Sequence, residues 1–358
     1  MQFSDLKDTM ECFTPGSTKK VLEHLVWYDV HEAPFRLYGF CEEGMQKGHP
    51  FCRVPAAVAA TVSEKVDILA KETAGGRIRF ATDAPFIALA CDLGKVNKYY
   101  RTLPAIGSAG FDVYRLEENG TQKFVNPLMP ATDRSFSDYV TMCSTDSHDL
   151  HTYTVNFPFH DQVAKVWIGL PEGATLAEGA PYRNEKPVVF YGSSITQGCC
   201  ASRPGLTYEA RISHAQNLHF LNLGFSGACK AEDAMIDYLT TLDMSVFVCD
   251  YDHNAPTPDH LASTLPRVYR AIRRTHPDVP FVFVSSPNPT GRKINHAIVA
   301  ENYRVAKASG DENVFLVTGE EMFADPEAQD FSIENVHMND FGFYWMAKAI
   351  GKVVKELV

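Results

Sequence analysis

The sequence lacks several features that would place it in a simple class. None of its apolar runs approaches 18 residues, so no segment is long enough to cross a membrane as a helix. The opening residues, MQFSDLKDTMECF, contain no basic segment followed by an apolar stretch, so we expect no signal peptide here, with secretion after removal of a leader as the alternative. Basic charge is scarce, because 44 acidic residues outweigh 33 Lys and Arg. Nucleic-acid binders usually present a basic surface, so neither nucleic acid nor a membrane is an expected partner.

The nine cysteines form no CxxC pair and no zinc-like spacing. Several lie inside apolar runs such as IALACDL and VFVCDY, where cysteine behaves as a small buried hydrophobic residue. Structural disulfides are rare in the cytoplasm, and this odd, scattered set predicts reduced thiols in a cytoplasmic protein.

From residue 187 the chain alternates short apolar strands with helical segments. The apolar runs are nearly continuous, which is typical of strands covered on both faces of a parallel sheet. They are residues 187–192, 219–224, 244–250, 279–286 and 313–319. Helices are predicted over residues 258–277 and 339–357. This alternation predicts a parallel, three-layer α/β fold.

The first half has a different pattern, in which short strands are separated by Gly, Pro, Asp and Asn turns. Several alternate polar and apolar residues, which predicts an antiparallel β-sandwich. The strands are residues 76–82, 85–93, 110–116, 152–157 and 164–170, and a helix is predicted over 58–73. A linker rich in Pro, Gly and Glu follows at 171–187. We therefore expect a β-sandwich domain at 1–175 and an α/β domain at 176–358.

Residues 188–200, VVFYGSSITQGCC, pose the question whether Ser194 is a nucleophile or part of a polar turn. The strand delivers Ser194 to the carboxyl edge of the sheet, where open α/β sheets bind ligands. A serine hydroxyl is a weak nucleophile, so it needs a base within reach and a group that orients the base. Taken alone, Gly-Ser-Ser after a strand is also typical of an ordinary turn or helix cap.

Later segments supply the other groups that acyl transfer requires. NLGFSGACKAED offers Gly227, whose backbone N–H could point at a developing oxyanion. VCDYDHNAP offers the side-chain amide of Asn254 as a second donor. SIENVHMNDFG offers His337 three residues after Glu334. In this order, the chain provides a nucleophile, oxyanion donors, an acid and a base.

These segments resemble the four blocks of the SGNH, or GDSL-type, hydrolases and esterases. YGSSITQG is similar to the nucleophile block, GFSG and YDHNA to the oxyanion glycine and asparagine blocks, and ENVH to the closing block. The resemblance covers residues 187–357 and implies a flavodoxin-like α/β/α domain that hydrolyses acyl esters. GFDVYRLEENG, at 110–120, is similar to the Gly-x-Asp-Leu-Tyr signature of an N-terminal, jelly-roll-like β-domain in one bacterial branch, with Val113 in place of leucine.

The chain departs from the family pattern at two positions. Ser193 replaces the aspartate before the nucleophile, and we expect it, like His253, to support the site without reacting. Glu334 replaces the aspartate that orients the base, and its longer side chain could still reach His337. Asp330, a backbone carbonyl or a Ser–His dyad without an acid are the alternatives.

Cys199 and Cys200 could be the reactive groups in place of Ser194. They lie five and six residues past that serine, and no histidine close in the sequence pairs with them. We therefore expect the two thiols to pack or to lie at the rim of the site.

The expected mechanism is that of a serine esterase. Ser194 attacks an ester carbonyl, His337 takes its proton, and Glu334 orients His337. The N–H groups of Ser194 and Gly227 and the amide of Asn254 hold the oxyanion. This chemistry requires no metal ion and no organic cofactor.

The expected substrate is a short acyl ester, above all an acetyl group on a carbohydrate, by analogy with modular sugar esterases. A broad short-chain or phospholipid acylhydrolase and an acyltransferase use the same chemistry. A glycan-binding protein with catalysis weakened at Glu334 is the alternative from a different class. A homo-oligomer is compatible with the sequence.

Overall fold

The computed structural model describes residues 24–95, 102–129, 138–287 and 292–358. The chain forms two compact units. Unit 1 comprises residues 1–53, 71–181 and 202–205, and unit 2 comprises 54–70, 182–201 and 206–358. This division differs from the two continuous domains expected, because residues 54–70 pack into the core of unit 2. Their buried side chains Val54, Ala59, Val66 and Leu69 belong to the same apolar cluster as Val189 of the second sheet.

Residues 54–70 form two helices where the sequence predicted one over 58–73. They are α3 (Ala56–Val62) and α4 (Glu64–Ala70). Ser63 between them is extended, with φ −171° and ψ 159°, and its hydroxyl accepts a hydrogen bond from the Val66 N–H at 3.2 Å. A serine that caps a new helix explains the break, since its side chain satisfies an N–H that has no partner within that helix.

Unit 2 is built on a five-stranded parallel sheet in the order β12-β11-β13-β14-β15. The strands are β11 (Val188–Gly192), β12 (Phe220–Gly224), β13 (Val246–Asp250), β14 (Phe281–Val284) and β15 (Val314–Val317). Each lies within the segment that the sequence predicted. The order is that of the flavodoxin-like sheet, in which ligands bind where the strand order reverses.

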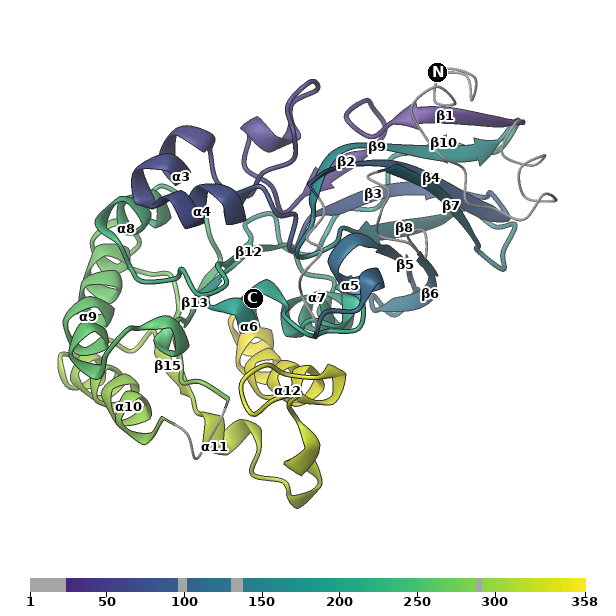
Figure 1. Cartoon of the computed structure of the whole chain (residues 1–358). Helices are drawn as coiled ribbons and strands as arrows, with labels where there is room; N and C mark the ends of the chain where they lie inside the picture. Colours follow the sequence, from purple (N-terminus) through teal and green to yellow (C-terminus); the bar gives the residue numbers. More distant parts are fainter. Residues whose placement is uncertain (1–23, 96–101, 130–137, 288–291) are drawn as a thin grey trace. The chain divides into compact units, whose positions relative to one another are not determined.

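Helices cover both faces of this sheet (Figure 1). They are α6 (Ser194–Gln197), α7 (Tyr208–Gln216), α8 (Asp233–Leu239), α9 (Pro258–Thr275), α10 (Lys293–Ala308), α11 (Gly319–Met322) and α12 (Asp340–Leu357), with short 3-10 turns at Pro204–Leu206, Asp252–Asn254 and Pro326–Asp330. On one face, Phe190 of β11 contacts Tyr208 of α7, whose ring stacks on Phe343 of α12. On the other, Val189 packs with side chains of α8, α9 and α10. The three-layer prediction is confirmed.

Unit 1 contains two antiparallel sheets. One has the order β1-β9-β4-β7, and the other β10-β3-β8-β5-β6 with β2 paired to β3. The strands are β1 (Leu25–Asp29), β2 (Arg36–Tyr38), β3 (Arg77–Thr82), β4 (Phe86–Lys95), β5 (Phe111–Leu116), β6 (Gln122–Leu128), β7 (Asp138–Ser144), β8 (His151–Asn156), β9 (Gln162–Pro171) and β10 (Leu176–Ala177). A 3-10 turn (Glu43–Met45) and α5 (Ala105–Ala109) complete the unit.

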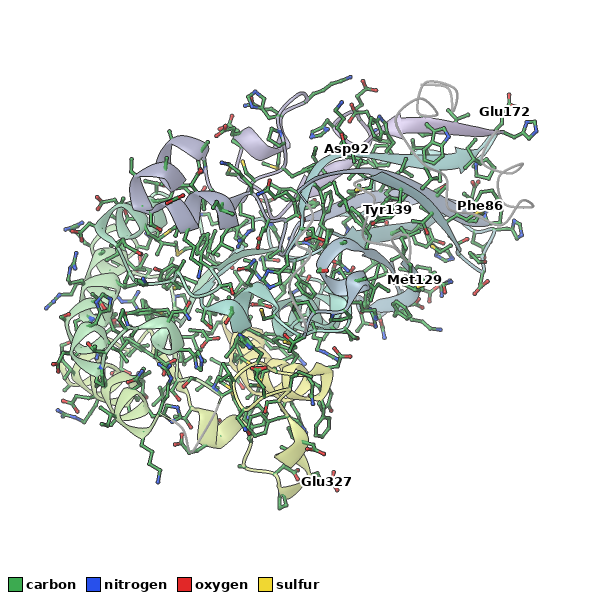
Figure 2. All side chains as sticks on the ribbon, in the orientation of Figure 1. Phe86, Asp92, Met129, Tyr139, Glu172 and Glu327 are labelled. Carbon is green, nitrogen blue, oxygen red and sulfur yellow. The ribbon has the colours of Figure 1, made fainter. Side chains whose placement is uncertain are left out.

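The core of unit 1 is an apolar cluster that draws buried residues from both sheets, which confirms the predicted antiparallel β-domain. Tyr139 of β7, labelled in Figure 2, is part of it, and its hydroxyl donates to the Ala109 carbonyl at 2.7 Å. In the part of the chain that the structure describes, no helix combines the length and apolar character that a membrane span needs.

Candidate active site

Ser194 is the first residue of α6, directly after the strand β11 and the cap residue Ser193. The Ser193 hydroxyl accepts a hydrogen bond from the Ile195 N–H at 3.1 Å. Serine and aspartate are both good N-caps, so the replacement of the family's aspartate at 193 preserves the start of this helix. The first N–H groups of a helix have no intrahelical acceptor, and that of Ser194 is among them.

The glycine Gly224 lets α6 pack closely on the end of β12. A Cβ at Gly224 would lie 2.2 Å from the backbone nitrogen of Gln197, so no other residue fits without moving the backbone. The Gln197 side-chain oxygen accepts a hydrogen bond from the Ser226 N–H at 2.8 Å. The helix that carries Ser194 is thereby joined to the loop that carries Gly227.

Ser194, His337 and Glu334 form one hydrogen-bonded chain. The Ser194 Oγ lies 2.9 Å from His337 Nε2, and His337 Nδ1 lies 2.7 Å from Glu334 Oε1. The side chains of His337 and Glu334 are 26% and 41% exposed, so solvent reaches this end of the chain. Asp330, the alternative acid, contacts this loop through its backbone carbonyl, which accepts from the Asn339 side chain at 2.6 Å.

The predicted oxyanion donors lie at the ends of neighbouring strands. Gly192 of β11 pairs in register with Gly224 of β12 and with Asp250 of β13, so the loops after these strands begin at one edge of the sheet. Gly227 has φ +64°, which favours glycine. Asn254 Oδ1 accepts a hydrogen bond from the Cys229 N–H at 3.3 Å.

That bond fixes the orientation of the Asn254 amide. Since Oδ1 faces Cys229, the Nδ2 group is turned away from it and has no acceptor among the described residues. The N–H groups of Ser194 and Gly227 likewise have no acceptor within the described part of the chain. Three unused donors on adjacent loops are what an oxyanion would require. Their catalytic roles remain predictions.

Two buried aspartates support the loop that carries Asn254. Asp250 accepts hydrogen bonds from Thr196 at 3.2 Å and Tyr208 at 3.3 Å. Asp252 accepts from the Ser286 N–H at 3.1 Å. Burial raises the pKa of both carboxyl groups above the usual range. These contacts join the end of β13 to α6 and α7, and the turn that carries Asn254 to the segment after β14.

His253 is partly buried and lies close enough to the proposed base for His337 to influence its pKa. Burial, followed by the nearby charge of Arg292 and an electrostatic effect of His337, lowers the pKa of His253 to about 4, while Glu334 opposes the shift. His253 is therefore neutral near pH 7, and its Nδ1 has no hydrogen-bond partner among the described residues. A pKa this low makes His253 a weak base, and its supporting role stays a prediction.

The sequence reasoning missed Lys65 at this site. The Lys65 Nζ lies 2.7 Å from the position that a Cβ on Gly227 would occupy, and Lys65 belongs to α4, far from Gly227 in sequence. Cys200 is buried, as expected, but its sulfur also lies within 4.8 Å of donor atoms of His337 and Glu334. Its position shortly after Ser194 in the sequence was the available signal.

The Gly-x-Asp-Leu-Tyr-like segment of unit 1 binds the short segment 202–205. Buried Asp112 accepts from Arg203 Nη1 at 2.7 Å, from the Gly205 N–H at 2.8 Å and from Asn156 at 2.8 Å. Burial raises the pKa of Asp112, and the charge of Arg203 opposes this. Tyr114 donates to the Gly205 carbonyl at 3.2 Å. The motif thus has a structural role within unit 1.

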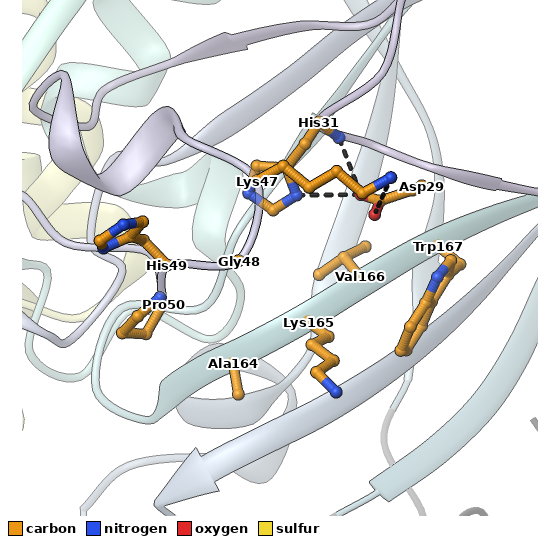
Figure 3. A pocket seen from close by; sticks show the side chains of 10 residues that line it. All are labelled: Asp29, His31, Lys47, Gly48, His49, Pro50, Ala164, Lys165, Val166 and Trp167. Atoms are coloured by element: carbon orange, nitrogen blue, oxygen red, sulfur yellow. Dashed lines mark hydrogen bonds and ion pairs between the residues drawn. The ribbon is translucent and has the colours of Figure 1, made fainter.

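Unit 1 also has a pocket of about 410 Å³ (Figure 3). His31 Nδ1 lies 2.9 Å from Asp29 Oδ1, and Lys47 Nζ lies 3.8 Å from Asp29 Oδ2. Trp167 lines the pocket although it is only 8% exposed. The lining includes neither serine nor cysteine, so the His31–Asp29 pair has no hydroxyl or thiol of the Ser or Cys type there to activate.

Two family profiles match the chain. Residues 185–355 match the GDSL-like lipase/acylhydrolase family, and residues 25–176 match the N-terminal domain, called GxDLY, of SGNH-hydrolase-type esterases. The two matches correspond to the two sequence patterns that carried the resemblance. No curated protein sequence matches significantly.

Solved structures share the fold over most of the chain. A protein described as a GDSL-like lipase from Bacteroides ovatus is 24% identical with a TM-score of 0.81, and the match covers 93% of this chain and 98% of that one. The salicylyl-acyltransferase SsfX3 from a tetracycline biosynthetic pathway is 19% identical with a TM-score of 0.74 and the same coverage. The acetyl xylan esterase Est2A from the rumen bacterium Butyrivibrio proteoclasticus is 11% identical with a TM-score of 0.59, again covering 93% and 98%.

Proposed function

Because the chain belongs to the GDSL-like lipase/acylhydrolase family, in the branch with a GxDLY N-terminal domain, we propose that it hydrolyses short acyl esters through Ser194, His337 and Glu334. The observation that carries this proposal is the chain of hydrogen bonds, 2.9 Å from Ser194 to His337 and 2.7 Å from His337 to Glu334. It supplies a nucleophile, a base and an orienting acid in hydrogen-bond contact.

In the first half of the reaction, Ser194 Oγ attacks the ester carbonyl carbon while His337 Nε2 accepts the hydroxyl proton. The carbonyl π electrons move onto oxygen, and the resulting oxyanion is held by the N–H groups of Ser194 and Gly227 and by Asn254 Nδ2. Glu334 accepts from Nδ1, so Nε2 keeps its lone pair toward the serine and the imidazolium that forms is stabilised.

In the second half, collapse of the tetrahedral species re-forms the carbonyl and expels the alcohol. The departing alcohol takes the proton from His337 Nε2 and leaves an acyl group on Ser194. Water then attacks the acyl-enzyme as His337 removes its proton, and a second collapse releases the acid and restores the Ser194 hydroxyl.

We propose acetyl groups on carbohydrates as the substrate class. The fold is shared with the acetyl xylan esterase of Butyrivibrio proteoclasticus, a fold-level analogy that supports this choice. The lack of a long apolar segment after residue 187 that could cover an acyl chain favours short acyl groups.

Acyl transfer to an alcohol is the second candidate, favoured by the shared fold with the salicylyl-acyltransferase. It differs from hydrolysis only in the acceptor, since an alcohol takes the place of water. Turnover of a p-nitrophenyl ester at increasing concentrations of a sugar, whose hydroxyl groups can accept the acyl group, distinguishes acyl transfer from hydrolysis. A new sugar ester formed at the expense of free acid would indicate a transferase, and release of acid alone a hydrolase.

The main experiment measures hydrolysis of p-nitrophenyl esters of increasing chain length beside acetylated sugars, with Ser194→Ala as the control. We expect acetyl and butyryl esters to be turned over fastest and Ser194→Ala to be inactive. Full activity in Ser194→Ala would show that the nucleophile is wrong. Equal turnover of chains beyond about ten carbons would contradict the short-acyl assignment.

Covalent labelling distinguishes the proposed esterase from a glycan-binding protein that has no catalytic activity. An organophosphonate reacts with an activated serine, so intact-mass analysis should find one adduct, located on Ser194 and lost in Ser194→Ala. Sugar binding with neither adduct nor turnover would instead favour the binding protein.

A further inference from the structure

Three groups that ligate transition metals meet at the proposed catalytic centre. They are the thiol of Cys200, the imidazole of His337 and the carboxylate of Glu334. One donor atom from each lies within 4.8 Å of the donor atoms of the other two. A tetrahedral Zn²⁺, with bonds of about 2.0–2.3 Å, places neighbouring ligand atoms roughly 3.3–3.6 Å apart. Small side-chain rotations would therefore bring these three donors onto one ion.

The backbone after α6 sets the position of the thiol. Cys200 has φ +74°, a left-handed conformation that non-glycine residues adopt rarely. The turn is held by hydrogen bonds from the Cys199 N–H to the Ser194 carbonyl at 2.9 Å and from the Ala201 N–H to the Gly198 carbonyl at 3.2 Å. Strained backbone of this kind concentrates at functional sites. The adjacent Cys199 is not part of the donor set.

We propose that Cys200, His337 and Glu334 form an inhibitory Zn²⁺ site. Thiolate, imidazole and carboxylate are the ligand types that zinc takes in proteins, and three protein ligands leave a fourth position for water. On binding, the Cys200 thiol loses its proton to solvent and its sulfur, a His337 nitrogen and a Glu334 oxygen each donate a lone pair to the ion. Partial exposure of His337 and Glu334, 26% and 41%, gives the ion access from solvent.

Zinc at this site blocks the base directly. His337 cannot both ligate the ion and keep its 2.9 Å contact with Ser194 as a proton acceptor, and Glu334 can no longer orient it. The inhibition rests on the proposed function, but the binding does not. Metal binding and ester turnover can therefore be tested independently.

Co²⁺ is a spectroscopic substitute for Zn²⁺, and Ser194→Ala is a suitable protein because Ser194 is not a ligand. Reduced Ser194→Ala titrated with Co²⁺ should develop a near-ultraviolet sulfur-to-cobalt charge-transfer band and the visible bands of a four-coordinate ion. Both should saturate at one equivalent, and Zn²⁺ should abolish them. Absence of these bands would overturn the site whatever the protein's activity.

The neighbouring cysteine provides the matched control. In the same background, Cys200→Ser should lose the charge-transfer band and Cys199→Ser should retain it. A charge-transfer band that survives in Cys200→Ser would mean that the metal binds a different thiol, and it would overturn the proposal. The sulfurs of Cys41 and Cys52, which lie 3.4 Å apart, could give such a band. His337→Asn is a second test, because it removes a ligand without changing the buried residue Cys200. It should also abolish the bands.

The activity measurement uses the protein with Ser194 intact. Zn²⁺ should inhibit ester hydrolysis, and EDTA should restore it fully. Measured against its own metal-free turnover, Cys200→Ser should require at least about tenfold more Zn²⁺ than the parent for half-inhibition, while Cys199→Ser should keep the parent's Zn²⁺ sensitivity. Equal Zn²⁺ sensitivity of the parent and Cys200→Ser would exclude Cys200 as a ligand. If no ester is turned over, the proposed function fails while the Co²⁺ titration still decides the metal site.

Discussion

Glu334 Oε1 accepts two hydrogen bonds from His337, one from the ring Nδ1 at 2.7 Å and one from the backbone N–H at 2.8 Å. The loop between the two residues contains Asn335 with φ +65° and closes back on Ser332, whose hydroxyl accepts the Asn335 N–H at 3.1 Å. This tight turn accommodates the extra methylene of glutamate. The backbone bond holds the carboxylate in place, so a glutamate can occupy the family's aspartate position and still contact the ring.

We expect Glu334→Gln to lower kcat by roughly 10²–10⁴. An amide can present either its oxygen or its NH₂ group to Nδ1, so it no longer enforces the tautomer that leaves Nε2 as the acceptor for Ser194. It also cannot stabilise the imidazolium by charge. Steady-state hydrolysis of p-nitrophenyl acetate measures the change, and KM should move much less than kcat.

Asp330→Asn is the matched control for that substitution. Its backbone carbonyl makes the contact with Asn339, which the change preserves, so kcat should stay within about twofold of the parent. A large loss in Asp330→Asn together with a small one in Glu334→Gln would reassign the acid to Asp330. Small losses in both would indicate a Ser–His dyad.

Asn254→Asp distinguishes the two functions of the Asn254 side chain, which are acceptance through Oδ1 and donation through Nδ2. The variant keeps an oxygen that can accept from Cys229, at 3.3 Å in the parent, but loses the Nδ2 donors. Loss of an oxyanion donor should reduce kcat by about 10²–10³ with little change in KM, because the donor binds the transition state more strongly than the substrate. A kcat within a factor of two of the parent would remove Asn254 from the oxyanion site.

The strands of unit 2 could be predicted from sequence because burial on both faces gives each of them an apolar run. In unit 1 the sequence predicted β3, β4, β5, β8 and β9, but not β1, β2, β6, β7 and β10. β6 contains Pro127, which lacks a backbone N–H and weakens a strand pattern, and β2 has only three residues. The packing of residues 54–70 in unit 2 depends on which core accepts their apolar face, and local patterns do not encode that choice.

At the candidate active site, too, local sequence patterns predict some residues and not those that depend on tertiary packing. Ser194, Gly227, Asn254 and His337 could be proposed because each follows a strand or precedes a helix at the edge where parallel strands end. Lys65 could not, since its position beside Gly227 depends on the packing of α4. The contribution of Cys200 also required coordinates, because the direction of its side chain follows from a left-handed residue that the sequence does not mark.

His253 makes the stability of the protein sensitive to acid. Its pKa is about 4 in the folded protein and 6.5 as the ordinary value, so between these pH values the unfolded chain binds a proton that the folded chain does not. This contribution to stability is complete above pH 6.5 and is lost as the pH falls toward 4, by on the order of 3 kcal/mol in total.

His253→Gln should therefore show a smaller loss of stability on acidification than the parent. Urea unfolding at pH 7.5 and pH 4.5 gives the free energies of unfolding, and the difference between the two pH values is the quantity to compare. His148, whose side chain is exposed, provides the control substitution His148→Gln, which should behave like the parent. An unchanged pH difference in His253→Gln would show that His253 is not the group responsible.

Asp112 should be a major determinant of the stability of unit 1. Asp112→Ala removes the carboxylate to which Arg203, Asn156 and the Gly205 N–H all donate, and removal of one partner of a buried ion pair typically costs about 3–5 kcal/mol. Denaturant unfolding in a Trp345→Phe background, in which only Trp27 and Trp167 of unit 1 fluoresce as tryptophan, measures this free energy.

A double-mutant cycle with Arg203→Met isolates the contribution of the pair, and we expect a coupling energy of about 1–3 kcal/mol. Glu301 and Arg304 provide the comparison, because their side chains are 54% and 67% exposed and solvent screens such a pair, so their coupling should be much weaker. Additive effects at Asp112 and Arg203 would show that Asp112 acts through Asn156 and the Gly205 N–H. The Gly-x-Asp-Leu-Tyr-like segment would then stabilise residues 202–205 by hydrogen bonds from uncharged donors to Asp112. Arg203 would contribute mainly through its contact with the Phe124 ring, 3.8 Å from the ring centre.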